Sequence, residues 1–269
     1  MKNKNSITFS KKLSILACEI ISEAKTSHIG SVLSIRDILS VLFCDYLHFT
    51  NKNILTNNRH RLILSKGHAG AGVYSALFLK GFITKKQIMS YCKDDSMLLG
   101  HITKNGIPGI DFSTGSLGHG LPVACGIALY LKKINSKNKV YVVMSDGELD
   151  EGSNWEAMLF ASHHNLNNLI IIIDYNNLQS LDTVKNTLNL EPLDKKISSF
   201  GLKVFKINGH SHDKLKNTFN KIDKKKPLCV ICKTTKGKGV DFMENKILWH
   251  YRSPDKKELK IALGKLRNA

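Results

Sequence analysis

The sequence predicts an α/β domain in which helices cover both faces of a parallel β-sheet. Short apolar runs, such as Val140-Tyr-Val-Val-Met144 and Leu169-Ile-Ile-Ile-Ile173, are typical of strands that are buried on both faces. These runs alternate with segments of helical periodicity, and most of the turns between them are short. The 269 residues contain no internal repeat and no linker, so we expect a single domain over residues 1–269.

Local signals place the elements in order. Residues 1–5 are expected to be disordered, and the first helix follows from the helical spacing of its apolar residues. Ser34 with Asp37, and Thr84 with Gln87, have the spacing of helix caps, and Gly81 stands where helices end. The expected helices cover residues 6–26, 35–47, 71–80, 84–92, 117–134, 193–200, 213–222 and 255–267, with one more around 155–157. The expected strands cover residues 61–65, 139–144, 169–173, 202–207 and 228–234.

Composition limits the classes of function. The formal net charge of +18 could suit a nucleic-acid partner, but the lysines are scattered and no nucleic-acid motif accompanies them. We therefore interpret the charge as solvated surface that also attracts phosphorylated substrates. No apolar stretch approaches the length of a membrane span, and the first residues lack the features of a secretory signal. A cytoplasmic protein is expected, or an organellar one whose targeting segment is absent.

The six cysteines do not predict a metal or redox site. Cys229 and Cys232 have the spacing of such a site, but they lie in an expected strand, where residues three apart point to opposite faces. No second pair of Cys or His residues completes a zinc site. We expect buried, reduced thiols.

Two expected strands end in residues that suit a metal-bound diphosphate. Asp146 follows one apolar run and Asn176 follows the other, and the carboxyl ends of parallel strands face one crevice. Carboxylate and amide oxygens are ligands for a hard cation such as Mg²⁺. Gly147 lets the backbone approach a ligand closely, and the N–H groups after it begin a helix, where anions bind. Two strands that end in ordinary turns are the alternative.

The wider pattern resembles a known family. Ser145-Asp-Gly-Glu-Leu-Asp-Glu-Gly152, a helix with Trp155-Glu-Ala157, and Asp174-Tyr-Asn-Asn-Leu178 resemble the thiamine diphosphate signature. Among enzymes with this signature, the chain is most similar to transketolases. The resemblance implies the thiamine diphosphate-binding fold and a domain of the diphosphate-binding type. It also implies that Asp146, Asn176 and the main-chain carbonyl of Leu178 hold Mg²⁺, with Ca²⁺ or Mn²⁺ as substitutes. Ser145 replaces the first glycine of the family's signature.

The loop at residues 94–120 is long enough to be functional. Its Phe112-Ser-Thr-Gly-Ser-Leu-Gly-His-Gly-Leu121 resembles the transketolase Thr-Thr-Gly-Pro/Ser-Leu-Gly-Gln-Gly loop, with His119 in place of Gln. The resemblance implies that the carbonyl of Gly115 contacts the aminopyrimidine and that Leu117 packs by the thiazolium. A helix start that needs glycine for its turns is the alternative. The resemblance implies this set of cofactor-binding residues: His68, Gly115, Ser116, Leu117, Asp146, Gly147, Glu148, Asn176 and His250.

Four of the eleven histidines stand where strands or helices give way to loops. Neutral imidazoles there can donate to phosphate or hydroxyl oxygens and can move protons near pH 7. The resemblance implies that His68 and His250 lie near the diphosphate and the reacting carbons, and that His28 and His101 face substrate hydroxyls. The predicted catalytic residues are thus His28, His68, His101 and His250. Apart from His119, we interpret the others as surface or capping residues: His48, His60, His163, His164, His210 and His212.

The C-terminal segment Lys236-Gly-Lys-Gly-Val-Asp-Phe-Met-Glu-Asn245 lacks the spacing of a P-loop. It resembles a segment that precedes Trp-His-Gly in short transketolase chains. Tyr251 replaces that last glycine and could crowd the entrance to the site. Glu151 matches a family glutamate that links cofactor sites across a subunit interface, or it is an exposed acid at a helix start.

The resemblance covers only the diphosphate-binding half of a complete transketolase, and the pyrimidine-binding domain is absent from the chain. It therefore implies the N-terminal subunit of a split transketolase, which forms an α₂β₂ assembly with a C-terminal subunit. The expected reaction transfers a two-carbon ketol unit between sugar phosphates, with thiamine diphosphate and Mg²⁺. Three alternatives remain: part of another thiamine enzyme (a 2-oxo-acid dehydrogenase α subunit or a deoxyxylulose phosphate synthase), a non-catalytic relative, or a basic nucleic-acid binder.

Overall fold

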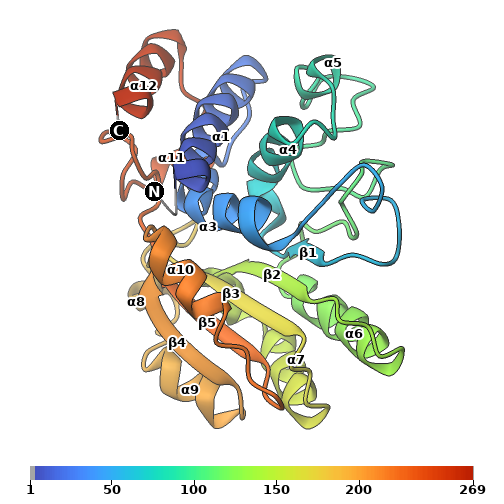
Figure 1. Ribbon diagram of the computed structural model, residues 1–269. Helices are drawn as coiled ribbons and strands as arrows, with labels where there is room; N and C mark the ends of the chain where they lie inside the picture. The colour runs from blue at the N-terminus through green and yellow to red at the C-terminus, as the bar shows by residue number, and fades with distance from the viewer. Residues whose placement is uncertain (1–3, 269) are drawn as a thin grey trace.

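A five-stranded, fully parallel sheet forms the centre of the computed structural model, which describes residues 4–268 (Figure 1). The strand order is β1-β2-β3-β5-β4. The strands are β1 (Arg61–Leu64), β2 (Val140–Ser145), β3 (Leu169–Tyr175), β4 (Lys203–Asn208) and β5 (Leu228–Lys233). The predicted fold class is confirmed, because helices pack on both faces of this sheet.

Two groups of helices cover the two faces of the sheet (Figure 1). The first face carries α1 (Lys4–Glu23), α2 (Ile29–Ser34), α3 (Arg36–Val41), α4 (Gly70–Leu79), α5 (Lys85–Ile88), α10 (His212–Phe219), α11 (Leu248–Tyr251) and α12 (Lys256–Asn268). The second face carries α6 (Gly120–Lys133), α7 (Gly152–His163), α8 (Val184–Thr187) and α9 (Leu193–Ser199). No described helix is both long and apolar enough to span a membrane.

Side chains of the central strand β3 alternate between two hydrophobic cores. Ile170 and Ile172 pack against the first group of helices, whereas Ile171 and Ile173 pack against the second. Such a run therefore needs apolar residues at every position, as the sequence has. In β5, Cys229 and Cys232 likewise point to opposite faces, and all six cysteines are free. The expectation of buried thiols holds for four of them, while Cys44 and Cys92 are half-buried.

The structure corrects the expected N-terminal elements. Helix α1 begins at Lys4, so the expectation of disorder was wrong for residues 4 and 5, and residues 1–3 lie outside the described part. The second expected helix is divided into α2, α3 and a π-helical turn over Leu42–Tyr46. Ser34 ends α2 instead of capping a helix, because its hydroxyl donates to the buried carboxylate of Asp174 at 2.7 Å.

Tight backbone contacts fix the glycine-containing loop against the end of β1. The N–H of Ile102 donates to the carbonyl of Gly67, and the N–H of Thr114 donates to the carbonyl of Ile102. A Cβ atom on Gly67 would lie 2.3 Å from the carbonyl oxygen of Thr114, so only glycine fits there without a shift. Similarly, Gly120 starts α6 against Ser65. The loop is thus anchored beside the carboxyl edge of the sheet.

Candidate active site

A cavity of about 170 Å³ lies beyond the carboxyl ends of β2 and β3. Ser145 at the end of β2 is in register with Asp174 of β3, so the residues that follow both strands meet at this edge. Ten of the residues predicted from the sequence line the cavity: His28, His68, His101, Gly115, Leu117, Asp146, Gly147, Asn176, Leu178 and His250. These residues come from distant parts of the chain, and the sheet brings them together.

Asp146 is a buried carboxylate between the ends of the two strands. One carboxylate oxygen accepts a hydrogen bond from the N–H of Gly147 at 2.8 Å, and the other accepts from the N–H of Asn177 at 2.7 Å. Burial, and next the negative charge of Asp174, raises the pKa of Asp146 to about 7. A bound cation would offset both effects and favour the ionised carboxylate.

The neighbouring oxygen atoms fit a hard divalent cation. Asn176 donates to Asp174 through its amide nitrogen at 3.1 Å, so this contact identifies the other end of the amide as the oxygen. That oxygen accepts from the N–H of Leu178 at 3.0 Å. The carbonyl oxygen of Leu178 lies 3.2 Å from the ammonium nitrogen of Lys236, so it already faces a positive charge. The three residues that carry this carboxylate, amide and carbonyl oxygen line a single cavity, and these are the oxygen types that Mg²⁺ or Ca²⁺ requires.

Histidine, cysteine and acidic side chains alone do not form a metal site. Within residues 4–268, no three of these side chains gather so that they could hold an ion. A cation in this cavity would therefore depend on the mixed set of oxygens at the ends of β2 and β3. Water and diphosphate oxygens commonly complete the coordination of Mg²⁺ at such sites.

A buried ion pair that we did not predict lies at the floor of the cavity, which Lys66 lines. The ammonium of Lys66 contacts the carboxylate of Asp174 at 2.5 Å, and both side chains are almost fully buried. The hydroxyls of Ser34 and Thr234 donate to the other oxygen of Asp174. Burial alone would raise the pKa of Asp174, but the charge and hydrogen bond of Lys66 and these hydroxyls lower it below its ordinary value. Lys66 directly follows β1, and its position at a strand end was the available signal.

Lys236 was also missed as a residue of the cavity. Its ammonium donates to the carbonyls of Leu178 and Gln179, and it lies 3.2 Å from Nδ1 of His250. Burial, and next the charge of Lys66, lowers the pKa of Lys236 to about 8. The resemblance of the segment that begins at Lys236 pointed to this region without giving the side chain a role.

The four predicted histidines form one cluster in the lining of the cavity. The ring centroid of His28 lies 5.2 Å from that of His68, 5.5 Å from that of His101 and 4.9 Å from that of His250. Burial lowers the pKa of His28 to about 4 and that of His250 to about 3, and it also lowers the pKa of His68 far below 6.5. These three imidazoles are therefore neutral at pH 7 and can both donate and accept hydrogen bonds.

A backbone contact holds two segments of this cluster together. The N–H of His28 donates to the carbonyl of His250 at 2.9 Å. His28 has a φ of 76°, which is the left-handed region that non-glycine residues rarely adopt. This conformation lets the chain turn between α1 and α2 while the imidazole faces the other three rings.

Two predicted cofactor-binding residues do not line the cavity. Ser116 is exposed on the loop before α6. Glu148 is fully buried, and its carboxylate accepts hydrogen bonds from the hydroxyl of Ser65 and from the N–H of Gly118. The 3-10 turn over Gly147–Asp150 directs this side chain towards the protein interior. Glu148 therefore ties the glycine-containing loop to the end of β1.

The three departures from the transketolase pattern lie at different places. Ser145 lines the cavity, whereas His119 is exposed at the start of α6. Tyr251 is 57 % exposed, and its ring centroid lies 5.0 Å from that of His250. Tyr251 does not line the cavity, so in this structure it lies outside the entrance that it could have crowded. Glu151 is exposed at the start of α7, a position that both of its interpretations allow.

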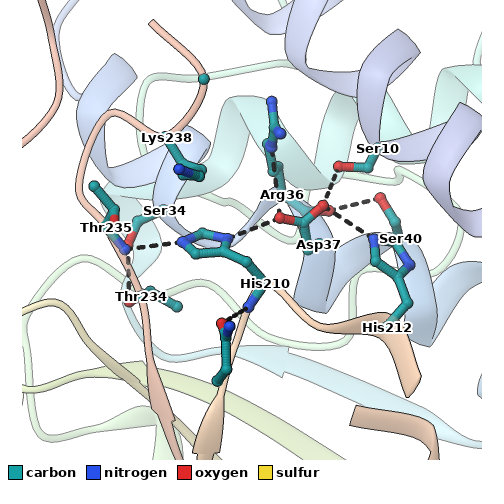
Figure 2. A network of polar contacts seen from close by, with 12 residues as sticks. Ser10, Ser34, Arg36, Asp37, Ser40, His210, His212, Thr234, Thr235 and Lys238 are labelled. Atoms are coloured by element: carbon teal, nitrogen blue, oxygen red, sulfur yellow. Dashed lines mark hydrogen bonds and ion pairs between the residues drawn. The ribbon is translucent and has the colours of Figure 1, made fainter. Parts of the chain in front are cut away.

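The interpretation of His210 and His212 as surface or capping residues was wrong. Both contact the buried carboxylate of Asp37, His210 through Nδ1 at 2.8 Å and His212 through Nε2 at 3.1 Å (Figure 2). Burial would raise the pKa of Asp37, but hydrogen bonds from these histidines and from Ser10, with Arg36 nearby, hold it well below its ordinary value. The contacts join residues more than 170 positions apart, so no local pattern could indicate them.

Comparison with known proteins identifies the family. Residues 6–265 match the family described as "Transketolase, thiamine diphosphate binding domain". The chain belongs to the transketolase family. Its fold and its sequence agree on this point, because the cavity that collects the predicted residues lies within the matched range.

Relatives of two lengths match the chain. An apulose-4-phosphate transketolase subunit from Actinobacillus succinogenes is 42 % identical over 242 residues, which cover 90 % of this chain and 88 % of the relative. The 6-deoxy-6-sulfo-D-fructose transketolase subunit SqwG from Clostridium sp. is 35 % identical over 254 residues, which cover 93 % of this chain and 92 % of the relative. Human transketolase is 34 % identical over 241 residues, but these cover only 38 % of that protein.

Solved transketolases share the fold. The transketolase from Campylobacter jejuni has a TM-score of 0.92 and 30 % sequence identity, and the match covers 99 % of this chain and 43 % of that one. The transketolase from Leishmania mexicana has a TM-score of 0.93, with 97 % of this chain and 41 % of that one covered. The chain thus spans about two fifths of the length of these transketolases.

Proposed function

We propose that the chain is the thiamine diphosphate-binding subunit of a two-subunit transketolase, which transfers a two-carbon ketol unit between sugar phosphates. The observation that carries this proposal is the single cavity in which Asp146, Asn176 and the carbonyl of Leu178 meet the histidine cluster. Membership of the transketolase family supports it. When bound, thiamine diphosphate supplies the nucleophilic carbon that this transfer requires.

Different residues of the cavity would contact the metal ion, the diphosphate and the thiazolium ring. Asp146, Asn176 and the Leu178 carbonyl would hold Mg²⁺, which neutralises the diphosphate. The N–H groups that follow Gly147 would contact diphosphate oxygens, while Leu117 would pack against the thiazolium. In this proposal the buried pair keeps the floor of the cavity electrically balanced and rigid.

The histidines would bind and protonate the sugar. Neutral imidazoles can donate a hydrogen bond to one hydroxyl oxygen while accepting from another, and they can move a proton without a large change of charge in the cavity. We propose that His28 and His101 contact substrate hydroxyls, and that His68 and His250 lie nearer the reacting carbons. The low pKa of His28 and His250 supports this role at neutral pH.

The second subunit would supply the pyrimidine-binding domain. The relatives of similar length carry the word subunit in their names, and the solved transketolases are more than twice as long as this chain. We propose an α₂β₂ assembly with that partner and a ketose phosphate as donor substrate. The relatives are named for apulose 4-phosphate or for a sulfonated fructose, so a substrate panel is needed to identify the donor of this chain.

Cofactor binding tests the metal site. We expect Asp146→Ala to lower the affinity for thiamine diphosphate with Mg²⁺ at least about a hundredfold, because a buried ligand to the ion is lost. The matched control is Glu156→Ala, which removes an exposed carboxylate from α7. Isothermal titration calorimetry measures both affinities. Unaltered binding by Asp146→Ala would refute its metal role.

Turnover tests the reaction. The chain and its C-terminal subunit, purified as a verified complex, are mixed with thiamine diphosphate, Mg²⁺, ribose 5-phosphate and either xylulose 5-phosphate or apulose 4-phosphate. We expect consumption of at least one donor ketose, which neither subunit catalyses alone. A complex that binds the cofactor but consumes no ketose of the panel would instead favour a non-catalytic relative.

A further inference from the structure

A second hollow, separate from the cofactor cavity, lies beyond the carboxyl ends of β4 and β5. This basic groove has a volume of about 750 Å³. It shares no lining residue with the cofactor cavity. The basic groove is lined by Lys206, Ile207, Asn208, His210, Lys214, Lys233, Thr234, Thr235 and Lys238. None of these described residues is acidic.

The positive charges of the basic groove are only partly compensated. Lys206 pairs with Glu191 at 3.1 Å and Lys238 pairs with Glu244 at 3.2 Å, but neither glutamate lines the groove. In the described part of the chain, Lys214 and Lys233 form no ion pair, and both are exposed. Lys206 and Lys233 also line a neighbouring hollow that contains Glu191. The positive potential of the basic groove therefore comes chiefly from Lys214, Lys233 and Lys238. A bound anion would offset this potential.

The floor of the basic groove is rigid because a buried network holds it. His210 lies between the groove and Asp37, with its Nδ1 on the carboxylate and its Nε2 accepting from the N–H of Thr235 at 2.9 Å (Figure 2). Since Nε2 accepts, the proton of the ring lies on Nδ1 and is donated to Asp37. The side chain of Asn208 accepts from the N–H of His210 at 2.9 Å. The floor of the groove therefore requires little rearrangement to receive a ligand, and the ordering cost falls on the lysine side chains.

We propose that the basic groove binds a small molecule with two or three linked phosphates. Lys214, Lys233 and Lys238 come from α10, the end of β5 and the loop after it, so they line the hollow from three different elements instead of one. A single phosphate would meet only part of this set, whereas a chain of phosphates can meet several ammonium groups at once. The carboxyl ends of adjacent parallel strands are also the usual place for ligands in open α/β sheets.

Calorimetric titration of the full chain with inorganic triphosphate tests the proposal. The titration is made in EDTA, so that it needs neither the cofactor nor its metal, and at about 0.1 M ionic strength, where the Debye length is about 10 Å. We expect one site per chain in the wild type. Lys214→Glu combined with Lys233→Glu should lower the affinity at least about tenfold, or about 1.4 kcal/mol. The matched control combines Lys224→Glu with Lys226→Glu, which makes the same change of charge just before the start of β5.

The outcomes separate binding in the basic groove from binding elsewhere on the chain. The control should retain the wild-type affinity within about twofold, since charges beyond a Debye length are screened. Equal losses in both double variants would mean that only net charge matters, and this would overturn the proposal. Loss of the site in Lys236→Gln, which removes an ammonium group from the cofactor cavity, would assign the triphosphate to that cavity and would also overturn the proposal. Absence of binding by the wild type, or binding only of an acidic peptide titrated in parallel, would also overturn it.

A second pair of variants, in which neutral glutamines replace the lysines, keeps the test independent of folding. Should the double glutamate variant melt at a lower temperature than the wild type, Lys214→Gln combined with Lys233→Gln removes the same two ammonium groups without adding carboxylates. We expect a smaller but still selective loss of affinity, relative to Lys224→Gln combined with Lys226→Gln. The proposed cofactor role can fail without affecting this result, because the cofactor is absent from the titration.

Discussion

Removal of the ammonium group of Lys66 should destabilise the chain strongly. The Lys66 and Asp174 side chains are 1 % and 0 % exposed, so Lys66→Met leaves a carboxylate in the interior without its charged partner. Breaking one side of a buried pair costs about 3–5 kcal/mol. Three neutral donors remain on Asp174, from Ser34, Thr234 and Asn176, and these place the expected loss near 3 kcal/mol, at the lower end of that range.

A double-mutant cycle with urea unfolding measures the contribution of the pair. Asp174→Asn alone should also be destabilising, because it leaves the ammonium buried. The combination of both changes should cost clearly less than the sum of the two, with a coupling of at least about 1.5 kcal/mol. The exposed control Lys224→Met should stay within about 0.5 kcal/mol of the wild type. Additive losses, or a loss below about 1 kcal/mol for Lys66→Met, would refute the reasoning.

Three further predictions concern stability. Gly67→Ala should lower the free energy of unfolding by about 1–3 kcal/mol, because its Cβ would overlap the Thr114 carbonyl. Gly126 is exposed in α6 and has open space around it, so Gly126→Ala should instead raise that free energy by about 0.5–1 kcal/mol. Urea unfolding checks both, and equal effects would contradict the packing argument. Burial lowers the pKa of His28 from 6.5 to about 4, so the folded state binds fewer protons than the unfolded state between these values. Stability is therefore complete above about pH 6.5 and should fall as the pH drops towards 4; a flat profile from thermal melts would contradict this. Asp37→Asn should cost about 2–4 kcal/mol, because its donors lose a buried charged acceptor, and a melting temperature equal to that of the wild type would count against the network in Figure 2.

The sheet and the floor of the cavity could be predicted because their signals are local. Each buried strand needs an unbroken apolar run, and the polar residue that follows must lie at the carboxyl edge. The sequence alone therefore predicted that Asp146 and Asn176 lie close together, and both line one cavity. The four catalytic candidates, by contrast, were selected by resemblance to transketolases. In the structure, the ring centroids of His68, His101 and His250 all lie within 5.5 Å of that of His28.

Contacts between distant segments could not be predicted in the same way. Nothing local indicates that Asp37 will lie between His210 and His212, because the pairing depends on α3 packing against α10. Similarly, Lys66 is a charged residue after a strand, and its full burial follows only from the position of Asp174 one strand beyond β2. The direction of the Glu148 side chain could not be predicted either. Glu148 follows β2 at the expected position, but its side chain points into the interior and not into the cavity.

The edge strand β4 affects how copies of the chain can associate. Within residues 4–268, strand β4 pairs only with β5, so its outer backbone groups could accept a strand from another molecule. Lys203 and Lys206 stand on this strand and lie over the rings of Phe205 and Tyr175, respectively. Both ammonium groups are also ion-paired, Lys203 with Asp223 and Lys206 with Glu191, so a second copy that extended the sheet would have to place its own charged side chains beside these pairs. Aggregation through this edge is therefore disfavoured, even though the interior of the sheet is among the most apolar parts of the chain.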